Sequence, residues 1–201
     1  MFSTLNKGNI LKFYKEEVLK KKEDWGIVLD VFEAEKSAFH RRFTGKIAQV
    51  IGDRYFTLLE GIVRNDVTLS ELERVYIGPG PRDKVSVIIR RIKMGDLTSI
   101  ARASIEKAVE KSVRENEERW VDFFNNAGPL TRKLHSLELL PGIGKKKMWK
   151  ILQEREKKRF ESFREIERRT GIDPIKVVAR RILDELSGVE KYELFACSQR
   201  C

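Results

Sequence analysis

Cysteine and histidine are scarce in this chain of 201 residues, and long hydrophobic runs are absent. The two cysteines, Cys197 and Cys201, cannot build a disulfide framework and are typical of a reducing cytoplasm. They could place two thiolates on one metal, but no second pair exists and His40 and His135 lie far away in the sequence. We therefore expect thiols without a role, and neither a metal nor a cofactor. No apolar run approaches the roughly 20 residues that span a bilayer, and no signal peptide opens the chain, so we expect a cytoplasmic protein without membrane association.

Positive charge, in contrast, is abundant and unevenly placed. The formal net charge is +10 and the pI is about 9.6. Residues 131–169 alone hold 13 Lys and Arg against six Asp and Glu, a net charge of +7, whereas residues 1–97 hold 18 against 14. The positive field is thus concentrated on one window of the chain, as expected for a site that binds a polyanion.

A segment rich in glycine and lysine, Leu140–Lys147, lies in this window between two stretches with apolar residues at helical spacing. These are Leu130, Leu134 and Leu137 before it, and Met148, Ile151 and Leu152 after it. The spacing predicts two helices joined by a tight hairpin, whose glycines take a positive φ and leave amide N–H groups bare at the start of the second helix. The helix dipole and three lysines favour an anion there, and a phosphodiester suits the combination best. The alternative is an ordinary helical corner with a solvated lysine run.

This pattern resembles the helix-hairpin-helix motif, which binds DNA and RNA without reading their sequence. We predict a nucleic-acid site in which residues 142–145 give backbone amides to one phosphodiester and the following helix extends the positive track. Such contacts fix position but carry no base readout. The predicted site residues are Gly142, Ile143, Gly144, Lys145, Lys146, Lys147, Lys150, Arg155, Lys157, Lys158 and Arg159.

A second, weaker hairpin follows 29 residues later, at Thr170–Pro174. Apolar residues at helical spacing come after it, over residues 175–186. Asp173 stands where the second glycine should be, and an acidic side chain there would repel a phosphate. Asp followed by Pro is, however, a good pair for the N-cap and first position of a helix. We therefore predict that the second hairpin is structural and that the first carries most of the binding.

The sequence before these helices has the residue pattern of β-strands. We expect strands at Gly26–Glu33, Lys46–Ile51, Arg54–Val63, Leu72–Ile77 and Lys84–Ile92. Five short strands in about 70 residues favour a small antiparallel barrel of the OB or SH3-like kind. The expected fold class is α+β in two parts, the barrel being followed by an all-helical helix-hairpin-helix domain. The expected divisions are an N-terminal helical extension (1–24), the barrel (25–95), connecting helices (96–128), the helix-hairpin-helix domain (129–188) and a C-terminal tail (189–201).

The connecting helices and the barrel each contain candidate contacts. Asp96 or Thr98 could cap the first connecting helix. The apolar cluster of Trp120, Phe123 and Phe124 favours a packing seam over a base-stacking platform. On the barrel, aromatic residues could stack on bases and basic ones could contact the backbone, although strand alternation buries about half of such side chains. These candidates are Arg54, Tyr55, Phe56, Arg74, Tyr76, Arg90, Arg91 and Lys93.

Several stretches resemble one known family, namely residues 25–30, 52–60, 73–78, 139–146 and 160–171, together with Asp173-Pro174. Over residues 25–195 the chain is similar to an archaeal family of unknown function, described as predicted nucleic-acid-binding, that joins a small barrel to a helix-hairpin-helix region. The resemblance implies this architecture and a role with nucleic acid, RNA rather than DNA, in translation or ribosome maturation. Met148 departs from the general hairpin pattern, in which a small residue is usual.

No catalytic set accompanies these motifs. Helix-hairpin-helix glycosylases place a catalytic Asp in an extended segment after the second helix, but Glu161–Arg164 lies in a predicted helix here. The cysteines of an iron–sulfur cluster and a Walker-type phosphate loop are missing, and Gly78-Pro79-Gly80-Pro81 contains too much proline to cradle a nucleotide. We therefore expect a binding protein and not an enzyme. The alternatives are a protein-interaction module of the translation or repair machinery and a DNA-repair accessory protein.

Overall fold

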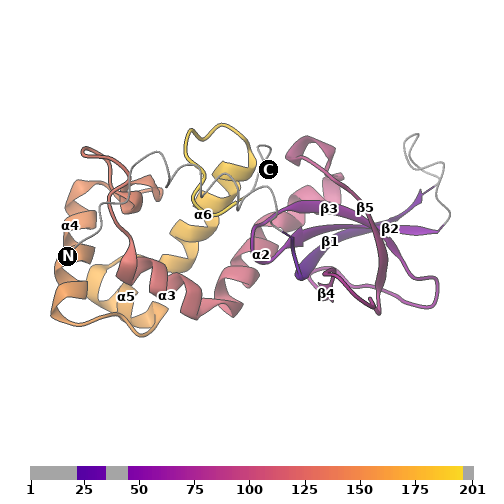
Figure 1. The fold of residues 1–201 in the computed structure, drawn as a ribbon, viewed down its shortest axis with the longest axis horizontal. Helices are drawn as coiled ribbons and strands as arrows, with labels where there is room; N and C mark the ends of the chain where they lie inside the picture. The colour runs from indigo at the N-terminus through magenta and orange to yellow at the C-terminus, as the bar shows by residue number, and fades with distance from the viewer. Residues whose placement is uncertain (1–21, 35–44, 197–201) are drawn as a thin grey trace, which may run out of the picture.

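The computed structural model describes residues 22–34 and 45–196. Its strands are β1 (Trp25–Glu33), β2 (Lys46–Gly52), β3 (Leu58–Val63), β4 (Arg74–Tyr76) and β5 (Val85–Arg91). Its α-helices are α2 (Ser99–Glu115), α3 (Glu117–Asn126), α4 (Lys145–Lys157), α5 (Phe163–Thr170) and α6 (Pro174–Leu186), with 3₁₀ helices η3 (Met94–Asp96) and η4 (Ser136–Leu139). The strands occupy one end of the molecule and most of the helices the other (Figure 1). The expected α+β class is confirmed, whereas the N-terminal helical extension and the two cysteines lie outside the described residues.

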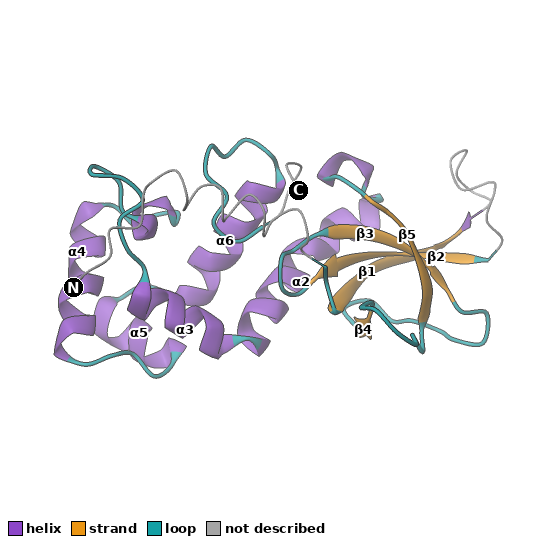
Figure 2. Ribbon diagram, in the orientation of Figure 1, coloured by secondary structure: helices purple, strands orange, loops and turns teal. Residues whose placement is uncertain are grey.

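The strands form one antiparallel sheet in the order β4-β1-β2-β3-β5, curled into a half-barrel (Figure 2). Register shifts between Val28 and Asp30 and between Glu60 and Gly61 mark bulges, which bend the strands. The expected five antiparallel strands are confirmed, with β3 starting at Leu58 because residues 53–57 form a turn. The sheet stays open, since β4 and β5 are its two edges among the described strands.

Both faces of this sheet carry buried apolar residues. Ile27 and Leu29 of β1 point to the helices and join a core that runs through α2 to α6. Val28 of β1 and Val50 of β2 point to the opposite, concave face, where a second apolar cluster forms. The alternation follows from the two-residue period of a strand. Because one core joins the sheet to the helices, the predicted domain boundaries within the chain stay predictions.

Helix α2 connects the sheet to the helical end. Its N-cap is Thr98, whose hydroxyl accepts a hydrogen bond from the Ala101 amide at 3.0 Å and donates one to Asp30 at 2.5 Å. The side chain of Gln49 accepts a hydrogen bond from the Thr98 amide at 2.9 Å. Helix α2 then packs against β1 on one side and against α6 on the other. Of the two predicted caps, Thr98 is therefore the one that caps α2.

The aromatic cluster of α3 is a packing seam, as predicted. Trp120 is 1% exposed and Phe124 is fully buried. The rings of Trp120 and Phe123 meet Phe195 edge-on, at centroid distances of 4.9 and 5.0 Å. These rings are therefore closed to a nucleobase.

The segment before α4 differs from the expected helix. The amides of Leu130 and Thr131 both bond to the carbonyl of Leu134, which makes a tight loop after Pro129. Leu130 is 43% exposed, so residues 130–134 offer no continuous apolar face that a helix could bury. Only the short η4 is helical here (Figure 2). The prediction of a helix from Leu130 is wrong, although Leu137 does enter the core.

His135 is the N-cap of η4 and accepts a hydrogen bond from the Leu137 amide at its Nδ1, over 3.1 Å. Only a neutral imidazole can accept this bond. Burial lowers the pKa of His135, and the nearby positive Arg155 lowers it further. The folded chain therefore favours the neutral ring, and the unfolded chain takes up the proton first as the pH falls.

Acidification should test this cap. Stabilisation by a neutral His135 is complete above the ordinary histidine pKa of about 6.5 and is lost as the pH falls below it. We expect the free energy of unfolding, measured with urea between pH 7.5 and 5.5, to fall more steeply for the wild type than for His135→Asn. Asparagine keeps an acceptor at the cap but does not titrate, and equal slopes would contradict this role of His135.

Candidate nucleic-acid interface

The turn before α4 has a left-handed residue, a buried residue and an N-cap in succession. Gly142 has a φ of +74°, which favours glycine. Ile143 is 3% exposed and its amide donates to the carbonyl of Leu140 at 3.0 Å. Ile143 therefore anchors the turn in the core, and its amide is not open to a ligand, contrary to our expectation for residues 142–145.

The first turn of α4 is uncapped. Gly144 occupies the N-cap position and no side chain caps it. The first hydrogen bond of the helix runs from the Met148 amide to the Gly144 carbonyl at 3.0 Å. The amides of residues 145–147 make no hydrogen bond within the part of the chain that the structure describes. They therefore form a set of open donors at the positive end of the helix dipole.

Gly144 is not required by the fold. Its φ is −86° and its ψ is −179°, a conformation that any residue adopts, so the expected positive φ is wrong at this position. A Cβ built on Gly144 would meet no atom within 4 Å. Neither close packing nor a left-handed backbone therefore requires a glycine at this position. The main effect of Gly144 is that no side chain covers the amides.

The turn before α6 repeats the left-handed glycine and the buried isoleucine but has a different cap. Gly171 has a φ of +75° and Ile172 is 3% exposed. Asp173 is the N-cap, and its carboxylate accepts a hydrogen bond from the Lys176 amide at 3.1 Å. Pro174 follows at the first helical position and has no amide to offer. The predicted capping role of Asp173 is confirmed, and this helix start is closed where that of α4 is open.

The predicted basic site residues of α4, together with Lys158 and Arg159 just after it, fall into two groups. In the first group the side chains are exposed and form no ion pair with another described residue; these are Lys145, Lys146, Lys147 and Lys150. In the second group Arg155 turns inward and donates to the carbonyls of Phe124 and Ala127 at 3.1 and 2.8 Å. Desolvation lowers the pKa of Arg155. The remaining members form exposed ion pairs, namely Lys157 with Glu154 (2.6 Å), Lys158 with Glu161 (3.0 Å) and Arg159 with Asp122 (3.6 Å).

Trp149 lies among the unpaired lysines and was missing from the predicted site. Its side chain is 58% exposed, an unusual state for so large an apolar group. Helical spacing could have found it, because Met148 and Ile151 are buried and a residue between them falls on the outer face. Lys145 and Trp149 are one turn apart and share that face.

Most of the candidate contacts on the half-barrel are buried or engaged with other groups of the protein. Phe56 is fully buried, so it cannot stack on a base. Arg90 is paired with Glu60 at 2.8 Å. The Tyr76 hydroxyl donates to the carbonyl of Pro79 at 2.6 Å. Arg74 is paired with Asp53 at 2.6 Å, and Arg54 lies over the ring of Tyr55, 5.2 Å from its centroid. Arg91 and Lys93 are exposed.

Other kinds of site find no support in the described residues. Within residues 22–34 and 45–196, no group of three or more His, Cys, Asp or Glu side chains could hold a metal ion. No helix in these ranges is long and apolar enough to cross a membrane. The open start of α4 is the most distinctive feature of the helical end, and it lies far from the sheet (Figure 1).

Two archaeal proteins are similar to this chain over most of its length. The uncharacterized protein MJ0038 of Methanocaldococcus jannaschii is 42% identical over 193 residues, which cover 94% of this chain and 88% of that protein. The crystal structure of Af1531 from Archaeoglobus fulgidus is also 42% identical, with a TM-score of 0.78, and the match covers 86% of this chain and 99% of that one. The family described as "Protein of unknown function (DUF655)" matches residues 22–197. The resemblance to an archaeal family of unknown function is thus confirmed, and the chain belongs to the DUF655 family.

Proposed function

We propose that this protein binds nucleic acid, RNA in preference to DNA, by holding the phosphodiester backbone at the start of α4. The observation that carries the proposal is the uncapped first turn of α4, whose open amides lie beside unpaired lysines. A phosphate offers several acceptor oxygens and a negative charge, which match these donors and the helix dipole. No acidic residue lies in the first turn of α4 to oppose it.

In this proposal, η4, the turn at residues 140–144 and α4 act as a helix-hairpin-helix unit, with η4 in place of a full first helix. The half-barrel serves as an OB-like or SH3-like partner surface. Amide and lysine contacts to phosphates position a strand without reading its bases. The closed turn before α6 supports this division, because Asp173 puts a carboxylate where Gly144 leaves an opening.

The exposed side chain of Trp149 favours a single-stranded nucleic acid as the ligand. Side chains on a helix tend to lean toward its N-terminus, which favours a position of the indole near the open amides of the first turn. Proteins commonly hold unpaired RNA bases by stacking them on exposed aromatic rings beside a basic surface. We include in the proposal the role in translation or ribosome maturation that the family resemblance implied. Sequencing the nucleic acid crosslinked to this protein in its native cells tests that role directly.

A protein-interaction module is the second candidate, since an exposed tryptophan is also common at protein interfaces. In that case α4 would dock another protein of the translation or repair machinery. The two candidates differ in whether purified protein binds purified RNA.

Binding to single-stranded RNA should weaken linearly with salt on logarithmic axes, because bound lysines release counterions. For three or four phosphate contacts the slope should be about −2 to −3. Fluorescence anisotropy with a labelled oligonucleotide measures it. Changing Lys145 and Lys146 together to Gln should make the slope less negative by about 1 to 1.5. As a control, Lys176→Gln, in the first turn of α6, should leave the slope unchanged. A flat response to salt would contradict the proposal and favour the protein-interaction candidate.

Gly144→Asp should separate binding from folding. The new carboxylate would cap α4 as Asp173 caps α6, so the free energy of unfolding should rise by a few tenths of a kcal/mol. The same carboxylate occupies the amides and repels a phosphate, so RNA affinity should fall about tenfold or more. Melting curves and RNA titrations of each variant measure the two effects.

The matched variant is Asp173→Ala in the second turn. Loss of the N-cap should cost about 0.5–2 kcal/mol of stability, whereas affinity should hold or rise slightly. If Asp173→Ala lost affinity as heavily as Gly144→Asp, both turns would bind and the proposed asymmetry would be wrong.

Trp149→Ala should lower the affinity for single-stranded RNA about tenfold, because base stacking on an aromatic ring is worth about 1–3 kcal/mol. Trp149→Phe should retain most of the affinity. Binding of a fully paired duplex should change little, since its bases are not free to stack. Equal losses for single strand and duplex would show that Trp149 does not contact a base.

A further inference from the structure

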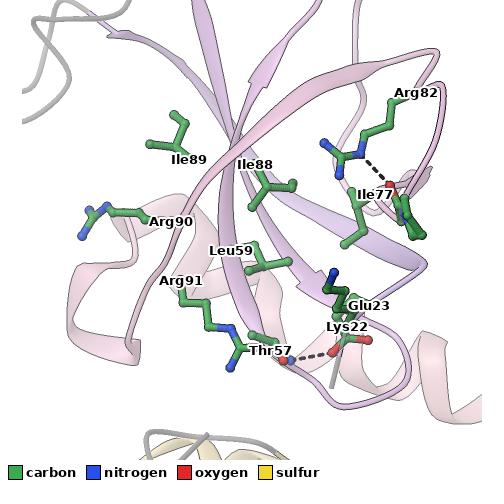
Figure 3. Close-up of a pocket in the computed structure, with 12 residues that line it drawn as sticks. Lys22, Glu23, Thr57, Leu59, Ile77, Arg82, Ile88, Ile89, Arg90 and Arg91 are labelled. Carbon is green, nitrogen blue, oxygen red and sulfur yellow. Dashed lines mark hydrogen bonds between the residues drawn. The ribbon is translucent and has the colours of Figure 1, made fainter. Parts of the chain in front are cut away.

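The concave face of the half-barrel, opposite the face that packs on α2, holds a groove of about 380 Å³ (Figure 3). Its floor is formed by Leu59, Ile77 and Ile88, from β3, the end of β4 and β5. Leu59 and Ile77 belong to the concave apolar cluster, and Ile88 packs against it. This volume is in the range that small-molecule ligands occupy in proteins.

The groove has a basic rim. Three cationic side chains border it, those of Lys22, Arg82 and Arg91, and the only carboxylate in its lining is that of Glu23. Arg90 also contributes to the lining, but its side chain is paired with Glu60 and points away from the groove (Figure 3). Arg82 is held in place because its Nε donates to the Gly78 carbonyl at 2.8 Å. Figure 3 shows its guanidinium turned toward Ile77 and Ile88. The rim therefore favours an anionic group at the end of the groove near Arg82.

The carboxylate of Glu23 lies at the end of the groove away from Arg82 (Figure 3), where the turn at residues 53–57 holds it. It accepts hydrogen bonds from the amides of Arg54, Tyr55 and Thr57, at 3.1, 3.0 and 3.0 Å. Burial raises the pKa of Glu23, and these amides oppose the rise. Its oxygens are thus directed into the protein backbone.

Thr57 supplies an unused polar group in this lining. The residue is 3% exposed, and its hydroxyl makes no hydrogen bond of normal geometry, although it is near enough to the Glu23 carboxylate to lower its pKa. A buried hydroxyl without a partner is energetically unfavourable. Such a group beside an apolar floor indicates a position for the polar edge of a ligand.

We infer that this groove binds a nucleotide, with its base over Leu59 and Ile88, the polar edge of the base at Thr57 and its phosphate at Arg82. A purely apolar ligand would leave the arginine and the hydroxyl unused, and a simple anion would not cover the floor. The shared chemistry is that of a nucleoside monophosphate, which can be a free molecule or one unpaired unit of a strand. The site is distinct from the start of α4 and does not depend on the function proposed for it.

Calorimetric titration with 5′-AMP, and with adenosine as the ligand lacking phosphate, tests the groove. The full chain carrying Gly144→Asp is used, so that the start of α4 contributes less to binding. AMP should bind more tightly than adenosine. Arg82→Gln should lower AMP affinity about tenfold and remove the difference between the two ligands, because it deletes a charge-assisted bond. The matched control Arg114→Gln, an exposed arginine on α2, should bind AMP as before.

Two further variants test the floor and the hydroxyl. Thr57→Val keeps the shape of the side chain and removes the unpaired hydroxyl, so it should fold normally and lose about two- to tenfold in affinity. Ile88→Trp, at a half-buried position, should fill the groove and abolish binding, with folding checked by its melting temperature. Normal AMP binding by Ile88→Trp, or equal affinity for AMP and adenosine, would overturn the inference.

The source of the nucleotide follows from a parallel titration with a single-stranded oligoadenylate. If AMP and the oligonucleotide both respond to Arg82→Gln, the groove takes a free nucleotide as well as a strand. If neither AMP nor adenosine binds measurably and only the oligonucleotide responds, the ligand is a unit of a strand. If neither ligand responds, the groove is not a nucleotide site, whereas the proposal for α4 would still stand on its own variants.

Discussion

The packing of α2 between the sheet and α6 is the constraint on which the rest of the structure depends. Thr98 fixes where the helix begins, because its side chain caps the first turn and bonds to Asp30, while Gln49 of β2 accepts a hydrogen bond from its amide. The far side of α2 then receives α6. A single helix thus holds the half-barrel at one end and the other helices at the opposite end, and it separates the groove from the start of α4 (Figure 1).

The start of α4 is held rigidly without being capped. Ile143 anchors the turn in the core, and Arg155 ties the second half of α4 to the carbonyls at the end of α3. The buried pair of Arg181 and Glu185 adds a further support, because Arg181 also donates to the carbonyl of Leu139 at 3.1 Å. Donors fixed in this way lose little conformational entropy when an anion binds, which favours affinity.

Periodicity and capping rules predicted most of the strands and helices. They failed where tertiary contacts determine the local structure or the direction of a side chain. Alternating apolar residues located the strands, and Asp173 was identified as a cap because its role depends on the next three residues alone. The loop at residues 130–134 was not predicted, because Leu130, Leu134 and Leu137 have the spacing of an apolar helix face. The sequence does not show that Leu130 is exposed in the folded protein. The inward turn of Arg155 could not be read from a charge pattern. The groove needed residues from separate strands and from the segment before β1, which no local window contains.

The two proposed sites differ in the kind of information they can read. The start of α4 offers backbone amides and lysines, which on this proposal would bind any phosphodiester regardless of its bases. On the proposal for the groove, its apolar floor and the hydroxyl of Thr57 would contact the base itself, which the amides and lysines at the start of α4 do not. Because α2 fixes their separation, a strand long enough to reach both would bind the second site at a high effective concentration once the first is occupied. On these proposals, α4 supplies the general affinity for a strand and the half-barrel supplies the choice among strands.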